Sequence, residues 1–238
     1  GQSIWNLEKR FTGWVDVDLT DQGKQEAEKA GLLIKKREIN IDFYYSSLQL
    51  RANKTLEIIQ TVLEDNKNFS KAWELNERHY GALQGLDKIE TAKKYGEEQV
   101  QIWRRSFDTP PPMAKENSKH DPNTHKLYND IDSKLPLGES LKDVVSRVTN
   151  TFEQILALTK DRCVLVVAHG NSIRAMVKML DNLSDNEIVD VNIPTGIPLA
   201  YNISGNNIEK IGYLGDKDTI KNLAKEVEMQ SKITDKKG

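Results

Sequence analysis

The sequence predicts an α/β fold, with a mostly parallel central sheet flanked by helices on both faces. The apolar run over residues 164–168 ends abruptly in His169 and Gly170, as expected of a buried parallel strand that opens into a helix. Segments of strand composition also alternate with segments whose apolar residues recur at helical spacing. The 238 residues, 37% of them hydrophobic, can bury one large core. We therefore expect one domain over residues 1–238, with two domains as the less favoured alternative.

Elements of both kinds are expected in the first half of the chain. Apolar residues at helical spacing predict helices over residues 25–36, 50–63, 90–95 and 100–105. Strand composition predicts strands over residues 42–46 and 72–75. Thr20 is expected to cap the first helix, and the prolines at 110–112 are expected to stop the helix before them.

The second half contains a long helix and a hairpin. Ser140 and Asp143 form a capping box before apolar residues that continue at helical spacing to Ile155. Residues 198–203 and 208–213 have the composition of two strands joined by a turn, and we expect them to pair as a hairpin.

Two polar stretches carry little apolar periodicity. Residues 113–135 are expected to form a surface excursion that exposes His120 and His125. Residues 217–238 are charged and weakly periodic, and we expect a polar C-terminal tail.

The composition excludes several classes of protein. With 34 basic and 36 acidic residues, the formal charge of −2 supplies no global field that would attract nucleic acid or an anionic membrane. Cys163 is the only cysteine, so an internal disulfide and a cysteine-rich metal site are excluded. No segment approaches the roughly eighteen uninterrupted apolar residues of a membrane span, and no basic-then-apolar stretch is present, so we expect neither a membrane span nor a leader. We expect a soluble, cytoplasmic protein.

His169 and Arg51 are the first candidates for a functional site. Open α/β sheets bind ligands beyond the carboxyl ends of their strands, where His169 is expected to lie. The N–H groups that begin the next helix attract anions, so a phosphorylated substrate is our first hypothesis. Arg51 falls in the first turn of its helix, where a cation is superfluous unless it holds an anion. The alternatives are a histidine that only packs at the strand end and a solvated arginine.

Two further clusters point to anion binding. Residues 75–81 concentrate an acid, a cation, an imidazole and a phenol just beyond an expected strand. Arg104 and Arg105 stand side by side and repel each other unless an anion lies between them. One guanidinium group can donate two parallel hydrogen bonds to two phosphate oxygens. These clusters therefore also indicate a phosphorylated ligand.

Seven blocks of the sequence together resemble the cofactor-dependent phosphoglycerate mutases of the histidine phosphatase superfamily. They occur in the family's order over nearly the whole chain, at residues 1–6, 10–14, 46–52, 75–85, 102–106, 168–172 and 193–198. The resemblance implies a glycolytic mutase that interconverts 3-phosphoglycerate and 2-phosphoglycerate through a phosphohistidine, primed by 2,3-bisphosphoglycerate. It also implies a homodimer or homotetramer, no metal, and a tail at 217–238 that closes over the active site.

The resemblance also implies roles for individual residues. Arg51 and His169 would hold the transferring phosphoryl group, and Glu77 would move the substrate hydroxyl proton. His79, in the same cluster, would be structural. The implied substrate-binding residues are Gly1, Ser3, Asn6, Thr12, Gly13, Arg78, Tyr80, Lys88, Arg104, Arg105, Gly170 and Asn171.

One feature of the family is not in this sequence. The family's loop begins with Arg-His immediately before the residues that match Gly1 to Ser3, so we expect the nucleophilic histidine and its strand upstream of Gly1. Two alternatives follow: a phosphatase of the same fold, in which water accepts the phosphoryl group, and a non-catalytic form that lacks the histidine.

Overall fold

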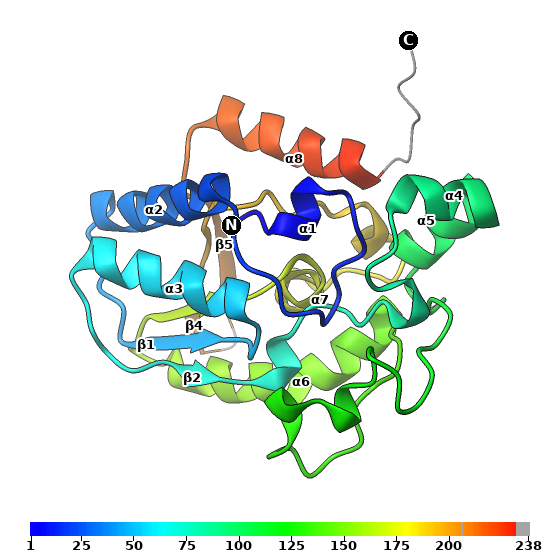
Figure 1. Cartoon of the computed structure of the whole chain (residues 1–238). Helices are drawn as coiled ribbons and strands as arrows, with labels where there is room; N and C mark the ends of the chain where they lie inside the picture. The colour runs from blue at the N-terminus through cyan, green and yellow to red at the C-terminus, as the bar shows by residue number, and fades with distance from the viewer. Residues whose placement is uncertain (206, 232–238) are drawn as a thin grey trace.

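The computed structural model describes residues 1–205 and 207–231, and its centre is a parallel sheet of three strands in the order β2-β1-β3 (Figure 1). The strands are β1 (Phe43–Ser46), β2 (Ser70–Lys71) and β3 (Val164–Val167). A separate antiparallel hairpin contains β4 (Leu199–Ser204) and β5 (Asn207–Tyr213), as expected. The predicted α/β class is confirmed.

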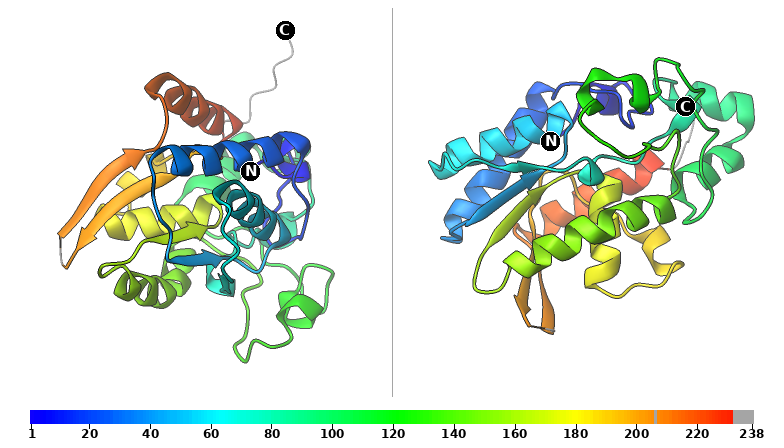
Figure 2. Two further views of the ribbon diagram at one scale, coloured as in Figure 1. Left: turned by 90° about the vertical axis from the view of Figure 1, so that its left-hand side faces the viewer. Right: turned by 90° about the horizontal axis from the view of Figure 1, so that it is seen from below.

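Helices cover both faces of the parallel sheet, and alternate residues of β3 show how. Val164 and Val166 pack into a core formed with α6 (Leu141–Leu158) and α7 (Gly170–Leu180). Leu165 and Val167 pack into a second core with α2 (Asp21–Lys36) and α3 (Leu50–Leu63). Figure 2 shows the two pairs of helices on opposite sides of the sheet. Because β3 is apolar on both faces, it holds the two cores together.

Local capping signals set where several helices begin. The Thr20 side chain accepts a hydrogen bond from the Gly23 N–H, so α2 starts at residue 21, earlier than the periodicity alone predicts. Ser140 and Asp143 form the expected capping box of α6. The predicted bounds of the helix over residues 50–63 are those of α3.

The prediction of a strand over residues 72–75 is wrong. β2 ends at Lys71, and Trp73–Leu75 forms a 3₁₀ helix. The carbonyls of Ala72 and Trp73 accept the N–H groups of Leu75 and Asn76 within this turn, and the Arg147 guanidinium donates to the Glu74 carbonyl.

The helices after this turn differ from the prediction mainly in length. They are α4 (Lys88–Tyr95), capped by Asp87, and α5 (Glu97–Arg105). α5 already ends at Arg105, so the prolines at 110–112 do not stop it. The remaining short helices are α1 (Ile4–Leu7) and the 3₁₀ segments Gly81–Leu83, Pro122–Thr124, Lys126–Tyr128 and Glu187–Asp190.

Residues 113–135 are irregular, as expected, but they do more than cover the surface. Tyr128 and Leu135 are buried with Trp14, and the Tyr128 and Trp14 ring centroids lie 5.1 Å apart. His125 is exposed as predicted, whereas His120 is half-buried.

The prediction of a weakly periodic tail is wrong over most of its length, because residues Lys217–Ser231 form α8. Asp216 accepts a hydrogen bond from the Thr219 N–H and so begins the helix. Ile220, Leu223 and Val227 are half-buried along one side of it. The last seven residues of the predicted tail, 232–238, lie outside the described residues.

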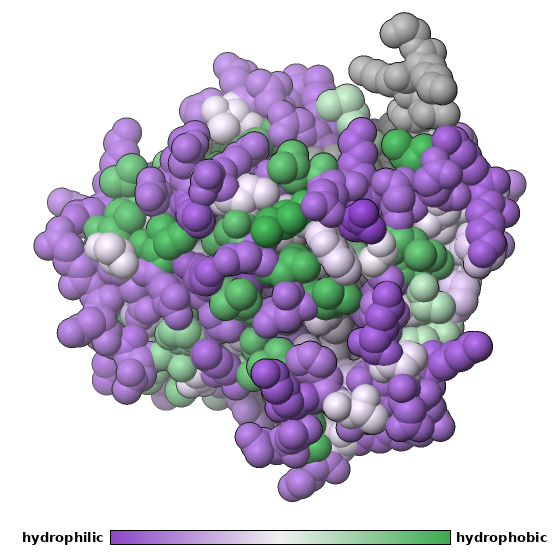
Figure 3. All heavy atoms as spheres, in the orientation of Figure 1, coloured by the Kyte–Doolittle hydropathy of each residue, from purple (hydrophilic) through white to green (hydrophobic). Residues whose placement is uncertain are grey.

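The face of the molecule in Figure 3 is mostly hydrophilic, with apolar patches scattered between charged side chains. The apolar side chains that are exposed include Leu7 and Leu32. Among the described residues, none of the helices combines the length and the apolar character that crossing a bilayer requires.

A buried ion pair between α6 and the segment before it fixes the loop over residues 74–79. Glu139 and Arg147 have side chains 2% and 8% exposed, and the Glu139 Oε1 to Arg147 Nε distance is 2.5 Å. Glu139 Oε2 also accepts from the His79 N–H at 2.8 Å. Arg147 donates to the carbonyls of Glu74, Asn76 and Glu77. The pair therefore ties four residues of this loop to α6.

We expect Glu139→Gln to lower the free energy of unfolding by about 3–5 kcal/mol, because it leaves the buried Arg147 charge without its partner. Urea denaturation followed by circular dichroism measures the change. Glu116→Gln is the matched control, since Glu116 pairs with Lys134 at the surface and an exposed pair contributes about 0–1 kcal/mol. Equal effects of the two substitutions would contradict a special role for the buried pair.

Candidate active site

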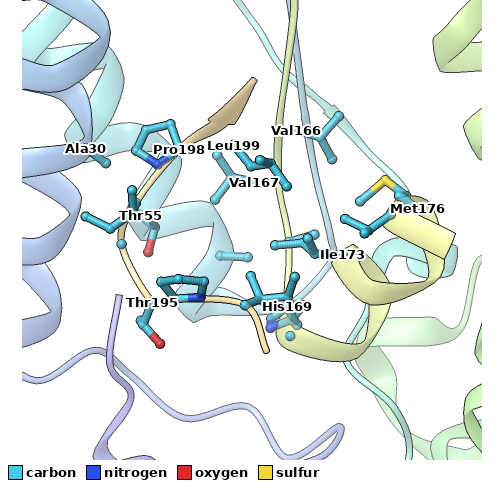
Figure 4. Close-up of a pocket in the computed structure, with 18 of the residues that line it drawn as sticks. Ala30, Thr55, Val166, Val167, His169, Ile173, Met176, Thr195, Pro198 and Leu199 are labelled. Carbon is cyan, nitrogen blue, oxygen red and sulfur yellow. The ribbon is translucent and has the colours of Figure 1, made fainter. Parts of the chain in front are cut away.

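A cavity of about 900 Å³ separates β3 from β4 and reaches the carboxyl end of β3. Val166, Val167, Met176 and Leu199 belong to its apolar part, as Figure 4 shows. β3 is hydrogen-bonded only to β1, and β4 only to β5, so the strand edges that face the cavity have no partner among the described residues. The polar part of the lining begins at His169, where β3 ends.

His169 lies where the carboxyl ends of β1 and β3 meet. It precedes α7, and its Nε2 atom lies 2.8 Å from the hydroxyl of Ser47, which follows β1. Burial of the imidazole, reinforced by the Arg51 charge, holds the pKa of His169 well below its usual value. The ring is therefore neutral near pH 7, and its one N–H can donate a hydrogen bond to an anionic oxygen.

Arg51 is buried in the first turn of α3 and not solvated. Its Nη2 donates to the Gly13 carbonyl at 2.8 Å, and its Nη1 to the Val15 carbonyl at 3.1 Å. The buried amide of Gln49 links the same carbonyl of Gly13 to the N–H of Glu77. These contacts bring the segment around Gly13, the start of α3 and Glu77 to one place.

The carboxylate of Glu77 has one anchored oxygen and one open oxygen. Oε1 accepts from the Arg78 N–H at 2.7 Å, and from the backbone N–H and Nδ2 of Asn171 at 3.2 and 2.8 Å. In the part of the chain that the structure describes, Oε2 accepts no hydrogen bond. It lies 3.8 Å from where a Cβ would stand on Gly170. A carboxylate fixed in this way can exchange a proton with a group in the cavity through Oε2.

Several cations lie close to Tyr80 and Glu77. Arg78 is fully buried, with its Cζ 4.6 Å from the Tyr80 ring centroid, and its Nε and Nη1 have no partner within residues 1–205 and 207–231. Burial and the nearby Arg104 charge lower the pKa of Lys88 to about 8. Burial opposes ionisation of the Tyr80 phenol, but the charges of Arg78 and Arg104 lower its pKa nonetheless. The pocket therefore favours an anion.

A model of the histidine phosphatase superfamily (branch 1) matches residues 1–197. The chain belongs to this superfamily.

Two bacterial relatives match this superfamily member over nearly its whole length. One, from Hydrogenobaculum sp., is 48% identical over 237 residues, which cover 98% of this chain and 96% of the relative. The other, from Treponema denticola, is 47% identical over 225 residues, 92% of this chain and 91% of the relative. Both are named 2,3-bisphosphoglycerate-dependent phosphoglycerate mutase.

Solved structures share the fold at lower sequence identity. The structure described as Bacillus stearothermophilus YhfR has a TM-score of 0.70 and is 19% identical, covering 92% of this chain and 95% of its own. The one described as Mycobacterial hydrolase 1 has a TM-score of 0.67 and 21% identity, with coverage of 88% and 92%. These two likenesses establish the superfamily's fold for this chain.

Most of the site residues expected of this superfamily member line the cavity. They are Gly1, Asn6, Thr12, Gly13, Arg51, Glu77, Tyr80, Lys88, His169 and Gly170. The other expected residues, Ser3, Arg78, Arg104, Arg105 and Asn171, do not line it. Ser3 is fully buried as the cap of α1, and Arg105 donates to the Asn192 side chain at 2.8 Å.

Several residues that hold the site together were not among the predicted site residues. Ser47 contacts His169, Gln49 bridges Gly13 and Glu77, and Arg147 holds the Glu77 carbonyl. Their partners lie far away in the chain, so only the tertiary structure identifies them. Leu223, Glu226 and Val227 of α8 also line the cavity.

His79 is built into the loop that it belongs to. Its Nδ1 accepts from the Gly81 N–H at 3.0 Å, and its Nε2 lies 3.0 Å from the His120 carbonyl, so the ring donates this hydrogen bond from a protonated Nε2. Burial lowers the pKa of His79 to about 4. These contacts agree with a structural role.

Nowhere in the described residues do three or more His, Cys, Asp or Glu side chains form a group that could hold a metal ion.

We expect the protein to lose stability as the pH falls from 6.5 to 4. The unfolded chain binds a proton at His79 near pH 6.5, whereas the folded protein resists it down to about 4. At 1.36 kcal/mol per pKa unit, His79 lowers the free energy of unfolding by ~2–3 kcal/mol across this window. Urea titrations at pH 7 and pH 4.5 measure it. His79→Gln should show a shallower pH dependence, and an unchanged dependence would assign the effect to other groups.

Proposed function

We propose that this protein is a 2,3-bisphosphoglycerate-dependent phosphoglycerate mutase, which interconverts 3-phosphoglycerate and 2-phosphoglycerate through a phosphohistidine. The observation that carries the proposal is the pairing of Glu77, which has one open oxygen, with the anion-binding groups Arg51 and His169 in one cavity. Relatives 45–48% identical over almost the whole chain, all named as such mutases, support it.

The phosphoryl group passes between a histidine nitrogen and the substrate hydroxyl oxygen. Arg51 and the neutral His169 hydrogen-bond its outer oxygens and stabilise the charge that spreads over them. As the new P–O bond forms and the P–N bond to the histidine breaks, the hydroxyl proton moves to Glu77 Oε2, and it returns in the reverse direction. The three N–H groups on Oε1 keep Oε2 directed at the cavity throughout.

A cluster of cations, which we define as Arg78, Lys88, Arg104 and Arg105, binds the rest of the phosphoglycerate. Arg78 and Thr12 carry buried polar atoms with no hydrogen-bond partner within the described ranges, at Nε, Nη1 and Oγ1, and these fit the carboxylate and phosphate oxygens of such a ligand. Lys88, Arg104 and Arg105 add positive charge at the same end. These residues would also hold 2,3-bisphosphoglycerate, which supplies the phosphoryl group that primes the enzyme.

We infer that the phosphorylated histidine is not His169 and that it precedes Gly1 in the chain, as the family resemblance implies. His169 Nε2 already contacts Ser47, which favours a supporting role. The apolar cavity between the edges of β3 and β4 suits an additional strand that leads to the site, and Gly1 lines the same cavity. Two buried strand edges without a partner are otherwise costly, since their N–H and C=O groups form no hydrogen bonds.

We further infer a cytoplasmic homodimer or homotetramer in which the chain forms one mutase domain and α8, over residues 217–231, covers the site. The apolar residues of α8 that line the cavity favour exclusion of water. Exclusion of water favours transfer between substrates over hydrolysis, and so favours the mutase over the phosphatase.

Full-length protein incubated with 3-phosphoglycerate should form 2-phosphoglycerate only when primed by 2,3-bisphosphoglycerate, and a chelator should leave the rate unchanged. Mass spectrometry of the acid-labile phosphoenzyme should place the phosphate upstream of Ser3. Release of inorganic phosphate faster than formation of 2-phosphoglycerate would favour the phosphatase. Phosphate on His169, or activity that requires a divalent metal, would overturn the proposed mechanism.

Glu77→Gln should lower kcat by about 100-fold or more, because the amide has the size of the carboxylate but cannot accept the hydroxyl proton. Steady-state kinetics of the full-length variant measure the loss, and circular dichroism checks the fold. Glu90→Gln is the control, since Glu90 is exposed and pairs with Lys93 on the surface of α4. Near-normal turnover of Glu77→Gln would make Glu77 a binding residue.

A further inference from the structure

Arg174 is a buried cation that none of the roles above uses. It lies on α7 one turn beyond Asn171 and is 5% exposed. Its Nη1 donates to Asn171 Oδ1 at 3.2 Å, and its Nη2 donates to the carbonyls of Ile188 and Val189 at 2.6 and 3.4 Å. The 3₁₀ segment Glu187–Asp190 thus fixes the guanidinium against Asn171.

The hydrogen bond from Arg174 decides which way the Asn171 amide faces. A guanidinium is only a donor, so it hydrogen-bonds the oxygen end of the amide and repels the NH₂ end. With Oδ1 directed at Arg174, Nδ2 is directed at Glu77 Oε1, 2.8 Å away. A flipped amide would place NH₂ against the guanidinium and oxygen against the carboxylate, and both contacts would be repulsive.

The orientation of Asn171 in turn decides which oxygen of Glu77 is open. Asn171 supplies two of the three N–H groups that bind Oε1, one from its backbone and one from its amide. Without the amide, Oε1 keeps two of those hydrogen bonds, and the carboxylate gains freedom to rotate. Rotation would turn Oε2 away from the position it needs for proton transfer.

We propose that Arg174 is a positioning residue, which acts through Asn171 to hold the Glu77 carboxylate in the orientation that proton transfer needs. The inference rests on the proposed function, because it assigns Arg174 a place in the same proton transfer. It does not require Arg174 to touch the substrate.

The test is a double-mutant cycle in the full-length protein between Arg174→Met and Glu77→Gln. Methionine keeps the length of the side chain but donates no hydrogen bond. Arg174→Met should lower kcat by ~10- to 100-fold, the cost of a misplaced reacting group, with a much smaller change in KM. In the Glu77→Gln background the same substitution should change kcat by less than about twofold, because the carboxylate it positions is already gone. Arg37→Met, at an exposed arginine at the end of α2, should leave both constants unchanged.

Three results would overturn the inference. They are an unchanged kcat for Arg174→Met, a loss of equal size in both backgrounds, and a loss confined to KM, which would indicate direct contact with the substrate. If Arg174→Met does not fold, Arg174→Gln keeps an amide for the carbonyls of Ile188 and Val189, and the same cycle applies to it. Absence of mutase turnover in the unsubstituted protein would instead refute the proposed function, so the two failures are distinct.

Discussion

The buried ion pair between Glu139 and Arg147 is the constraint on which the rest of the site depends. Burying two charges is expensive, and an apolar pair of the same volume would serve the core as well or better. An apolar pair, however, could not form hydrogen bonds with the backbone of the loop. Arg147 donates to three loop carbonyls, at Glu74, Asn76 and Glu77, while Glu139 accepts from the N–H of His79. The loop that carries Glu77 is therefore anchored by its backbone, which leaves the Glu77 side chain free for chemistry.

From that anchored loop, a chain of directed hydrogen bonds extends to each part of the site. Gln49 joins the Glu77 N–H to Gly13, and Arg51 takes the same Gly13 carbonyl. On the other side, Asn171 joins the Glu77 carboxylate to Arg174. Each of these connecting side chains is buried, so each contact is stronger than it would be in water and costly to break. The geometry of the site is accordingly set before a ligand enters.

Positive charge in this protein is concentrated at the site, whereas the net charge of the whole molecule is close to zero. The net charge of −2 draws no anion to the molecule as a whole, yet several buried cations surround Tyr80 and Glu77. Burial, together with the nearby charges of Arg105 and Arg78, lowers the pKa of Arg174 to about 10. Such a cluster is unfavourable in isolation, and a bound anion relieves it. The site thus gains selectivity for phosphorylated acids from an arrangement that destabilises the empty protein.

The sequence alone determined the features whose signals are local. The apolar run that becomes β3, the capping box at Ser140, the stripe of α3 and the motifs that resemble the superfamily could all be predicted, because each depends on residues close together in the chain. Tertiary structure decided the rest. Trp73–Leu75 forms a 3₁₀ helix and not a strand, and Arg147, 73 residues away from Glu74 in the chain, takes the Glu74 carbonyl. Likewise, which oxygen of Glu77 is open depends on Asn171, 94 residues away, and on its contact with Arg174. Contacts of this kind form only when packing brings distant segments together, so no local pattern of residue types encodes them.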